Sequence, residues 1–339
     1  MRARLVMVTL LVGGSLWAAE PEVRSLAVPP ELVAVTANPE PSGVAWSAPR
    51  QRYLVVTDDS GLPEEDTKHE PLLLGLSEEG AFDKAPIPIR GVKAINDPES
   101  ICAGPDGSYF LVTSHSPNRK GKTGAPRRQL LQLQESKGGL AVVARLDLTK
   151  LKRGGSLLAL AGLPPDGRLD IEAIAYRDGA LFVGFKSPLG EHGEAVIIRL
   201  RNAVATLRAG KLSAEALERF AAIPLCVDGA KDASVCQGIS DMTFLPDGSL
   251  VVSANAPKGG PKDHGGALWH LPAPVGKAPP VLLHRFARLK PEGVTLAADG
   301  RTLKVVFDCD QGVPKWADVP LPARERTKQP RAAIDVSGP

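Results

Sequence analysis

The stretch that decides the fold is Asn96–Ser116, which reads NDPESICAGPDGSYFLVTSHS. It contains an acidic residue, a short apolar run, an Asp-Gly turn, a second apolar run and a polar cluster. Two apolar runs joined by a tight turn predict a β-hairpin, because glycine supplies the positive φ that such turns need. A hairpin brings its two ends together, so Glu99 and the cluster Thr113–Ser116 are expected at the same edge of a sheet.

The same pattern occurs in four other places. These copies begin at Pro41, Asp170, Gly238 and Pro291, and three of them turn at Asp178-Gly179, Asp247-Gly248 and Asp299-Gly300. Further apolar runs follow the copies, such as Leu72–Leu76 and Ile87–Ile89 after the first, and four strands per repeat is typical of the blade of a β-propeller. Before the first copy, Val23–Val28 and Leu32–Val35 are expected to form one or two edge strands. We therefore predict an all-β fold, a single β-propeller over residues 20–323, with all hairpin turns on one face and closed by N-terminal strands. Five blades are visible, and a sixth, degenerate blade between Leu146 and Pro165 or near residues 200–225 stays open.

The composition agrees with a globular chain of short strands. Of the 339 residues, 43% are hydrophobic and 23% are charged, while Gly 34 and Pro 31 against 4% aromatic residues indicate many turns. The formal net charge of +3 is small and mostly scattered, so nucleic acid is not an expected partner. No P-loop, dinucleotide fingerprint, Gly-x-Ser-x-Gly elbow or His-Glu-x-x-His motif occurs, which disfavours the corresponding reaction classes.

The N-terminus resembles a secretory signal. Met1–Arg4 is basic, Leu5–Trp17 is apolar, and Ala18-Ala19 offers small residues before Glu20. We predict a signal peptide over residues 1–19, with an uncleaved anchor helix as the alternative, and hence a periplasmic or extracellular protein. The polar residues 324–339 are expected to be a disordered tail, and no later apolar stretch is long enough to span a membrane.

Export implies an oxidising compartment in which disulfides persist. Cys226 and Cys236 bracket a polar loop, and we predict a disulfide between them. Cys102 and Cys309 lie inside apolar strand patterns and are expected to be small, buried, unpaired side chains.

Aligning the copies on their turns predicts a polar ring at one mouth of the central channel. Five residues take the equivalent position: Ser42, Glu99, Glu172, Ser240 and Glu292, with Asp241 one residue further in. The second strands end in a second polar set: Asp58-Asp59, Ser114-His115, Lys186-Ser187, Asn255 and Asp308–Asp310.

Several carboxylates held close together repel one another, and a cation, a basic partner or a raised pKa relieves the repulsion. Oxygen-only groups suit a hard divalent cation such as calcium. The predicted metal ligands are Glu99, Glu172, Glu292 and Asp241. The alternative is structural: each glutamate caps its blade by accepting hydrogen bonds from backbone amides of the neighbouring blade, and both roles can hold at once.

His115 is the candidate acid or base, because histidine titrates near neutrality. Its alternative is a histidine whose hydrogen bonds are satisfied within the loop. A basic run follows it, from Arg119 to Arg128. Arg127 and Arg128, together with Lys186 and Asn255, are the candidate contacts to a small anionic ligand, although such a run is also typical of a solvated loop.

Seven blocks of this sequence resemble a known family. They are Ser42–Ala45, Asp97–Ser100, Ser114–Ser116 with the Lys/Arg loop after it, Ile171–Ala175, Gly184–Pro188, Gly238–Asp241 and Pro291–Val294. In this order, over most of residues 40–310, they resemble the blocks of the bacterial domain-of-unknown-function 3616 family. The family pattern has Arg where Lys186 stands and commonly Arg where Ser240 stands, so the anion contacts of those positions do not transfer directly.

More distantly, the repeat is similar to phytase-like and other six-bladed calcium propellers. The resemblance implies a propeller with its site at these blocks and adds weight to a hydrolase, but it implies no established activity. Two functional classes remain. One is an exported, metal-dependent hydrolase acting on an anionic ester or phosphoester at the channel mouth. The other is a non-catalytic propeller that binds a ligand or partner there, and calcium binding without turnover would favour it.

Overall fold

The computed structural model describes residues 20–33, 35–36, 39–57, 72–118, 120–152, 155–228, 234–256, 265–309 and 312–321. The predicted signal peptide, the predicted C-terminal tail and the predicted site residues Asp58, Asp59 and Asp310 therefore lie outside the described residues, as does Arg119.

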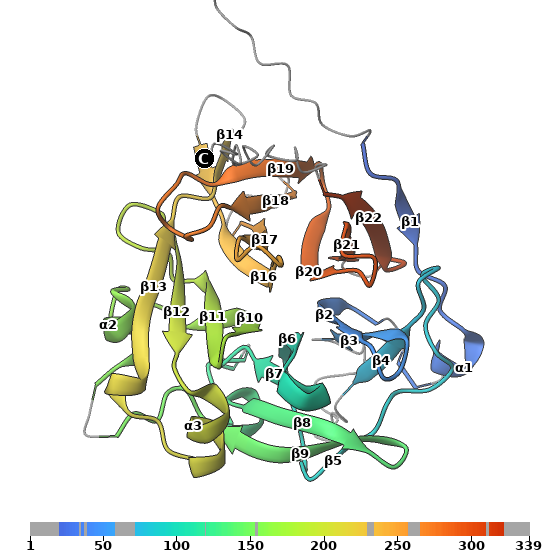
Figure 1. Cartoon of the computed structure of the whole chain (residues 1–339), viewed down its shortest axis with the longest axis horizontal. Coiled ribbons are helices and arrows are strands. Elements are labelled where there is room, and N and C mark those ends of the chain that lie inside the picture. Colours follow the sequence, from blue (N-terminus) through green and yellow to red (C-terminus); the bar gives the residue numbers. More distant parts are fainter. Residues whose placement is uncertain are drawn as a thin grey trace, which may run out of the picture.

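Five sheets surround a central axis and form a five-bladed β-propeller (Figure 1). The innermost strand of each blade contacts the innermost strands of both neighbouring blades, which closes the ring. Blade 1 contains β2 (Pro41–Ser47), β3 (Arg52–Thr57) and β4 (Leu73–Leu76). Blade 2 contains β6 (Pro98–Ala103), β7 (Ser108–Thr113), β8 (Leu130–Ser136) and β9 (Gly139–Leu146).

Blades 3 to 5 follow in chain order. Blade 3 contains β10 (Asp170–Arg177), β11 (Ala180–Ser187), β12 (Ala195–Leu200) and β13 (Leu217–Ile223). Blade 4 contains β16 (Gly238–Phe244), β17 (Leu250–Asn255), β18 (Gly266–Leu271) and β19 (Val281–Phe286). Blade 5 contains β20 (Lys290–Leu296), β21 (Thr302–Asp308) and β22 (Lys315–Pro320).

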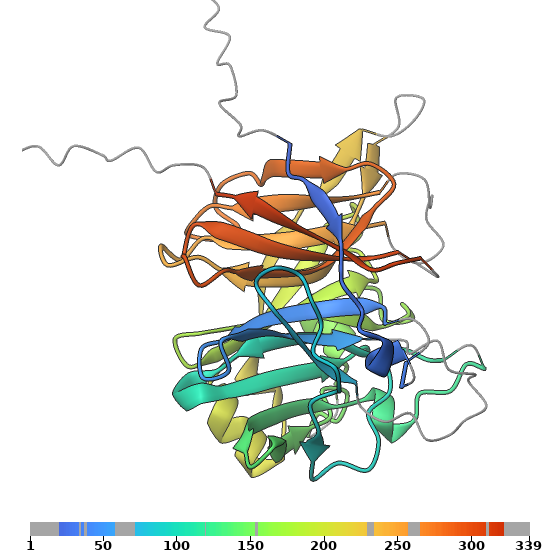
Figure 2. The same ribbon diagram turned by 90° about the vertical axis from the view of Figure 1, so that its right-hand side faces the viewer.

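The N-terminal strand closes the ring, as predicted. Strand β1 (Val23–Ser25) pairs antiparallel with β22 and becomes the fourth strand of blade 5, along whose edge it lies in Figure 2. This arrangement joins the two ends of the propeller through backbone hydrogen bonds.

Two predicted outer strands are wrong in detail. The segment around Leu32–Val35 is not an edge strand, because Pro30–Val33 forms the short helix α1. The run Ile87–Ile89 does not belong to blade 1: Ile89–Arg90 forms β5, which pairs in parallel with β9 of blade 2. Apolar runs indicate strands but do not choose between two neighbouring sheet edges.

No sixth blade occurs among the described residues. The two segments where a sixth blade was considered, between Leu146 and Pro165 and near residues 200–225, have other structures. They contain α2 (Leu157–Ala161), α3 (Ala203–Ala209), a 3₁₀ turn at Ala214–Ala216 and β13 of blade 3. Two further 3₁₀ turns lie at Pro105–Gly107 and Ala125–Arg127.

The core consists of five apolar clusters, one between each pair of adjacent blades. Successive side chains of a strand point to opposite faces of the sheet. In β3, Leu54 and Val56 therefore pack toward blade 2, while Tyr53 and Val55 pack toward blade 5. Because both faces of every blade are buried, the strands are almost continuously apolar and polar residues gather at their ends.

A small hairpin, β14 (Cys226–Asp228) and β15 (Ser234–Cys236), precedes blade 4. The predicted Cys226–Cys236 disulfide joins its two strands, and Cys102 and Cys309 form no disulfide, as predicted, but their side chains are only partly buried. In the described part of the chain, no helix has the length and apolar character required to cross a membrane.

Candidate functional site

The first residues of the five innermost strands meet at one end of the channel. The Ile171 amide of β10 donates to the Ser114 carbonyl at the end of β7, 2.8 Å away. Gly43 of β2 lies against the backbone of Glu99 and Ser100 in β6. Equivalent strands therefore run in the same direction, and the hairpin turns lie together at the opposite end, as antiparallel pairing requires.

Each innermost strand has a β-bulge at its entrance. In all five blades the pairing register with the second strand skips one residue, and the skipped residues are Ser42, Glu99, Glu172, Ser240 and Glu292. These are the five residues that the sequence alignment placed in the equivalent position. A bulge leaves its extra residue out of the pairing and re-aims the side chain. The repeated bulge thus gives the five blades a similar geometry at the mouth, and in blade 3 a second register shift also skips Lys186 of β11.

Three carboxylates converge at this mouth. Glu99, Asp170 and Glu172 each offer one oxygen, and these three oxygens lie within 4.8 Å of one another. Glu99 and Asp170 are buried, with 8% and 5% of their surface exposed. Calcium–oxygen bonds are about 2.3 to 2.6 Å long, so two oxygens on opposite sides of one calcium ion are about 4.6 to 5.2 Å apart. The spacing therefore fits a single calcium ion.

Lys186, at the end of β11, connects two of the predicted carboxylates. Its Nζ atom donates to Glu172 Oε2 at 2.5 Å, to Ser240 Oγ at 2.9 Å and to Glu292 Oε2 at 3.3 Å. Burial raises the pKa of Glu172 well above its usual range, and the charges of Asp170 and Glu292 act in the same direction. Burial alone would lower the pKa of Lys186, but Glu172 and Glu292 outweigh it and raise that pKa. The pKa of Lys186 thus reflects the carboxylates around it, whereas that of Glu172 is raised mainly by burial.

Asn255, at the end of β17, positions the neutral side of the ring. Its Nδ2 atom donates to Ser240 Oγ at 2.8 Å and to the Pro291 carbonyl at 3.1 Å. Ser240 is thereby held between Asn255 and Lys186. Asn255 and Lys186 are both buried, and the Oδ1 atom of Asn255 has no hydrogen-bond partner among the described residues.

Asp241 is not part of the converging group, although the sequence predicted it as a metal ligand. It lies one step further along β16, completely buried, with Oδ1 accepting from the Ser100 hydroxyl at 2.7 Å and Oδ2 from the Val294 amide at 2.9 Å. Burial raises its pKa well above the usual range, and hydrogen bonds from backbone amides, including that of Val44, oppose the rise. Asp241 therefore links the innermost strands across the channel axis and has the structural role.

The contacts of His115 fit the alternative of a histidine whose hydrogen bonds are satisfied by nearby backbone groups. Its Nδ1 atom lies 2.7 Å from the Thr113 carbonyl, and its Nε2 atom accepts from the Leu148 amide at 3.4 Å. The two bonds fix the neutral tautomer with the proton on Nδ1. Burial lowers the pKa of His115 to about 4, so the ring is uncharged at neutral pH. Because both ring nitrogens face backbone groups, the geometry does not support the predicted acid–base role.

The two predicted arginine contacts are engaged by acidic residues at the ends of blade 2. Arg127 donates to the Ser116 carbonyl at 2.9 Å and forms an ion pair with Asp97, just before β6. Arg128 forms an ion pair with Asp147, just after β9, at 3.3 Å. The two guanidinium groups thus pair with Asp97 and Asp147, which are not members of the converging carboxylate group.

Sequence analysis missed two residues of this region, Asp170 and Ser100. Asp170 is two residues before Glu172, and residues separated by two lie on the same face of a strand. That spacing was available as a signal. The role of Ser100 was not, because it depends on the channel-crossing contact with Asp241.

No protein-family model matches the sequence. A comparison with curated proteins finds no match either. Several solved structures are similar in fold. A gluconolactonase from Xanthomonas campestris is 12% identical, with a TM-score of 0.42 and coverage of 90% of this chain and 91% of that chain.

Two other solved structures show the same degree of similarity. The calcium-binding protein regucalcin from Agrobacterium tumefaciens is 10% identical, with a TM-score of 0.39 and coverage of 84% of this chain and 92% of that chain. A glycosyl hydrolase from Bacteroides ovatus is 12% identical, with a TM-score of 0.46 and coverage of 84% and 85%. These similarities carry no functional argument, which rests on the residues of this chain.

Proposed function

We propose that this protein is an exported β-propeller that binds a divalent cation, calcium, at the mouth of its channel. The ligands are Glu99, Asp170 and Glu172. The observation that carries the proposal is the approach of their three carboxylate oxygens to within 4.8 Å of one another. The donor set consists of oxygen alone, which is the preference of calcium.

The charge balance supports the same conclusion. Four carboxylates gather at the mouth, Glu99, Asp170, Glu172 and Glu292, and Lys186 is the one basic group that contacts them among the described residues. With all four ionised, these five side chains together carry a net charge of −3. A divalent cation at Glu99, Asp170 and Glu172 would offset most of that charge.

The finer proposal is that the site hydrolyses an anionic ester or phosphoester. The cation would polarise the carbonyl or phosphoryl oxygen of the substrate. Glu292 lies outside the three-carboxylate group and is held by Lys186, so it is the residue that would accept a proton from water. Lys186 orients both Glu172 and Glu292. The internal contacts of His115, Arg127 and Arg128 favour a second candidate, a propeller that binds the cation without turnover.

We also propose that the chain is related to the domain-of-unknown-function 3616 family. This relationship is supported by the position of the matching blocks, since Asp97–Ser100, Ile171–Ala175 and Pro291–Val294 each contribute a bulged glutamate to the mouth. Export is supported by the basic and apolar N-terminus and by the Cys226–Cys236 disulfide.

Isothermal titration calorimetry with calcium on chelator-treated protein tests the cation site. We expect Glu172→Gln to weaken calcium binding by at least about tenfold, because one ligand charge is lost. The control is Glu218→Gln, which removes a carboxylate paired with Arg199 on the outer strands of blade 3. Absence of calcium binding by the wild type, or equal affinity in the wild type and Glu172→Gln, would contradict the proposal.

Turnover of a phosphomonoester and of a carboxylate ester in the presence of calcium separates the two candidates. The hydrolase requires turnover that Glu292→Gln abolishes while calcium affinity stays within about threefold of the wild type. Calcium binding with no turnover of either substrate identifies the binding propeller.

A further inference from the structure

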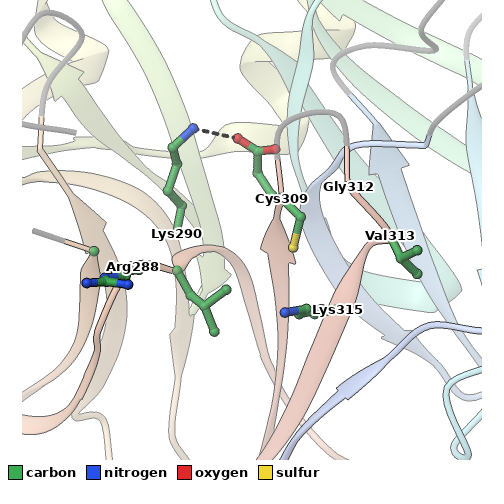
Figure 3. A pocket seen from close by; sticks show the side chains of 9 residues that line it. Arg288, Lys290, Cys309, Gly312, Val313 and Lys315 are labelled. Carbon is green, nitrogen blue, oxygen red and sulfur yellow. Dashed lines mark hydrogen bonds and ion pairs between the residues drawn. The ribbon is translucent and has the colours of Figure 1, made fainter. Parts of the chain in front are cut away.

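A cavity opens between blades 4 and 5, and none of its lining residues is one of the proposed calcium ligands Glu99, Asp170 and Glu172 of blades 2 and 3. Its volume is about 340 Å³, which is within the range of sites for small molecules. Three cationic side chains line it, Arg288, Lys290 and Lys315, with Asp308 as the one carboxylate among the described lining residues (Figure 3). The described lining groups therefore carry a net charge of about +2 at neutral pH.

The cations come from two segments of the chain. Lys290 begins β20 and Lys315 begins β22, while Arg288 lies in the turn between β19 and β20. Arg288 has φ of 60°, in the left-handed region that non-glycine residues seldom adopt. The next residue of this turn, Leu289, is held by its carbonyl, which accepts from the Gly266 amide at 2.8 Å. Rigid elements thus present charge to the cavity from more than one side.

Only part of this positive charge is neutralised by the described lining residues. Lys290 pairs with Asp308 at 2.9 Å, the residue opposite it in the strand register. Arg288 and Lys315 form no ion pair within the described part of the chain. A guanidinium and an ammonium group facing one cavity bind phosphate or carboxylate through charge-assisted hydrogen bonds.

The cavity also has an apolar part. Leu289 and Val313 line it, and Val313 is 57% exposed, an unusual value for a large aliphatic side chain in this protein. We infer that this cavity binds a small organic anion, with a phosphate or carboxylate head at Arg288 and Lys315 and an apolar portion against Leu289 and Val313. The site is distinct from the proposed cation site and does not depend on it.

Cys309 reports occupancy of the cavity, because it lines the cavity and forms no disulfide. The rate of Cys309 alkylation by the neutral reagent iodoacetamide is measured by peptide mass spectrometry. Chelator keeps the proposed cation site empty. Constant ionic strength keeps electrostatic screening equal for all probes. The probes are inorganic phosphate, phenyl phosphate and benzoate, with chloride as reference. At ten times its dissociation constant, a bound anion leaves about one site in eleven free, so alkylation slows about tenfold.

We expect phenyl phosphate to protect at lower concentration than inorganic phosphate, because its ring contacts the apolar part. Comparing the protection by phenyl phosphate with that by benzoate shows whether the site prefers a phosphate or a carboxylate head. The variant Arg288→Gln/Lys315→Gln should lose the protection. Lys277→Gln, which removes a charge from the turn at the other end of blade 4, should keep it. Absence of protection and of calorimetric binding with all three probes, or equal protection in the double variant, would overturn the inference.

Discussion

Lys186 and Glu172 form a buried ion pair, with Nζ and Oε2 separated by 2.5 Å. The same Nζ atom also contacts Glu292, so a single positive charge serves two carboxylates. This arrangement stabilises the mouth of the channel, but one positive charge does not neutralise two carboxylates. A lysine therefore shares with the proposed calcium ion the task of holding the carboxylates together.

Replacing Lys186 by methionine should show how much Lys186 and calcium each contribute to holding the carboxylates together. Without calcium, the variant should lose about 3 to 5 kcal/mol of unfolding free energy, because buried carboxylates are left without their cation. Calcium should restore part of the loss, because it supplies positive charge to the same group. Urea unfolding with chelator and with calcium measures both effects.

Lys304→Met is the matched control for this experiment. Lys304 is also buried and paired with a carboxylate, Asp318 at 2.7 Å, but it lies between blades 1 and 5 over the Trp316 ring. Calcium should leave the stability deficit of this control unchanged. The interpretation fails if calcium rescues both variants equally.

The sequence predicted the position of the site better than its contacts. Aligning the five hairpins on their turns found the five bulged residues, because each hairpin repeats one local geometry from its turn to its open end. The alignment did not find the bulges themselves. It also did not assign Lys186 to Glu172, since that contact joins strands of one blade through rotamers that no repeat pattern specifies.

Long-range contacts explain why three predicted site residues are not part of the converging carboxylate group. Asp241 has the composition of a metal ligand, but contacts with Ser100 and Val294 from other blades place its oxygens in the channel interior. His115 and Arg127 have the residue types of a site, and the neighbouring loop satisfies them instead. Residue type suggests chemistry, whereas the partner that satisfies a polar group depends on tertiary packing.

The burial of His115 predicts a pH dependence of stability. Its pKa is about 4 in the folded protein and about 6.5 when unfolded, so the unfolded chain binds the extra proton between these values. This contribution to stability is complete above about pH 6.5 and declines as the pH falls toward 4. The variant His115→Gln should show a weaker decline over this window in urea unfolding. An unchanged pH profile would mean that the imidazole is accessible and titrates normally.

The close contact between blades 1 and 2 predicts the effect of Gly43→Ala. A Cβ atom at Gly43 would lie 2.6 Å from the Ser100 Cα atom and 2.7 Å from the Glu99 carbonyl oxygen, so a backbone must shift. We expect a loss of about 1 to 3 kcal/mol from overpacking and weaker calcium binding, because Glu99 moves. Gly124→Ala is the control, since its nearest contact would be an ordinary 3.5 Å. Equal stability of the two variants would contradict the close contact.

The central position of Asp241 leads to the last prediction. Ser100 donates to Asp241 and itself accepts from the Ile174 amide at 3.2 Å, so β10, β6 and β16 are connected in series. The Val294 amide connects β20 to the same carboxyl group. With the bond from Val44 of β2, one side chain links the innermost strands of all five blades.

Asp241→Asn should therefore destabilise the whole ring. At pH 5 we expect a loss of about 1 to 3 kcal/mol, because the amide nitrogen meets a hydrogen-bond donor where a carboxyl oxygen accepted. The raised pKa of Asp241 means that the folded protein keeps a proton that the unfolded chain loses above about pH 3.9. The contribution of Asp241 to the unfolding free energy of the wild type then falls as the pH rises toward the folded pKa. The difference in unfolding free energy between the wild type and Asp241→Asn should therefore shrink over this range. The fully exposed turn variant Asp178→Asn should match the wild type throughout, and a difference for Asp241→Asn that grows with pH would show that the buried carboxylate is ionised and fully solvated by its donors.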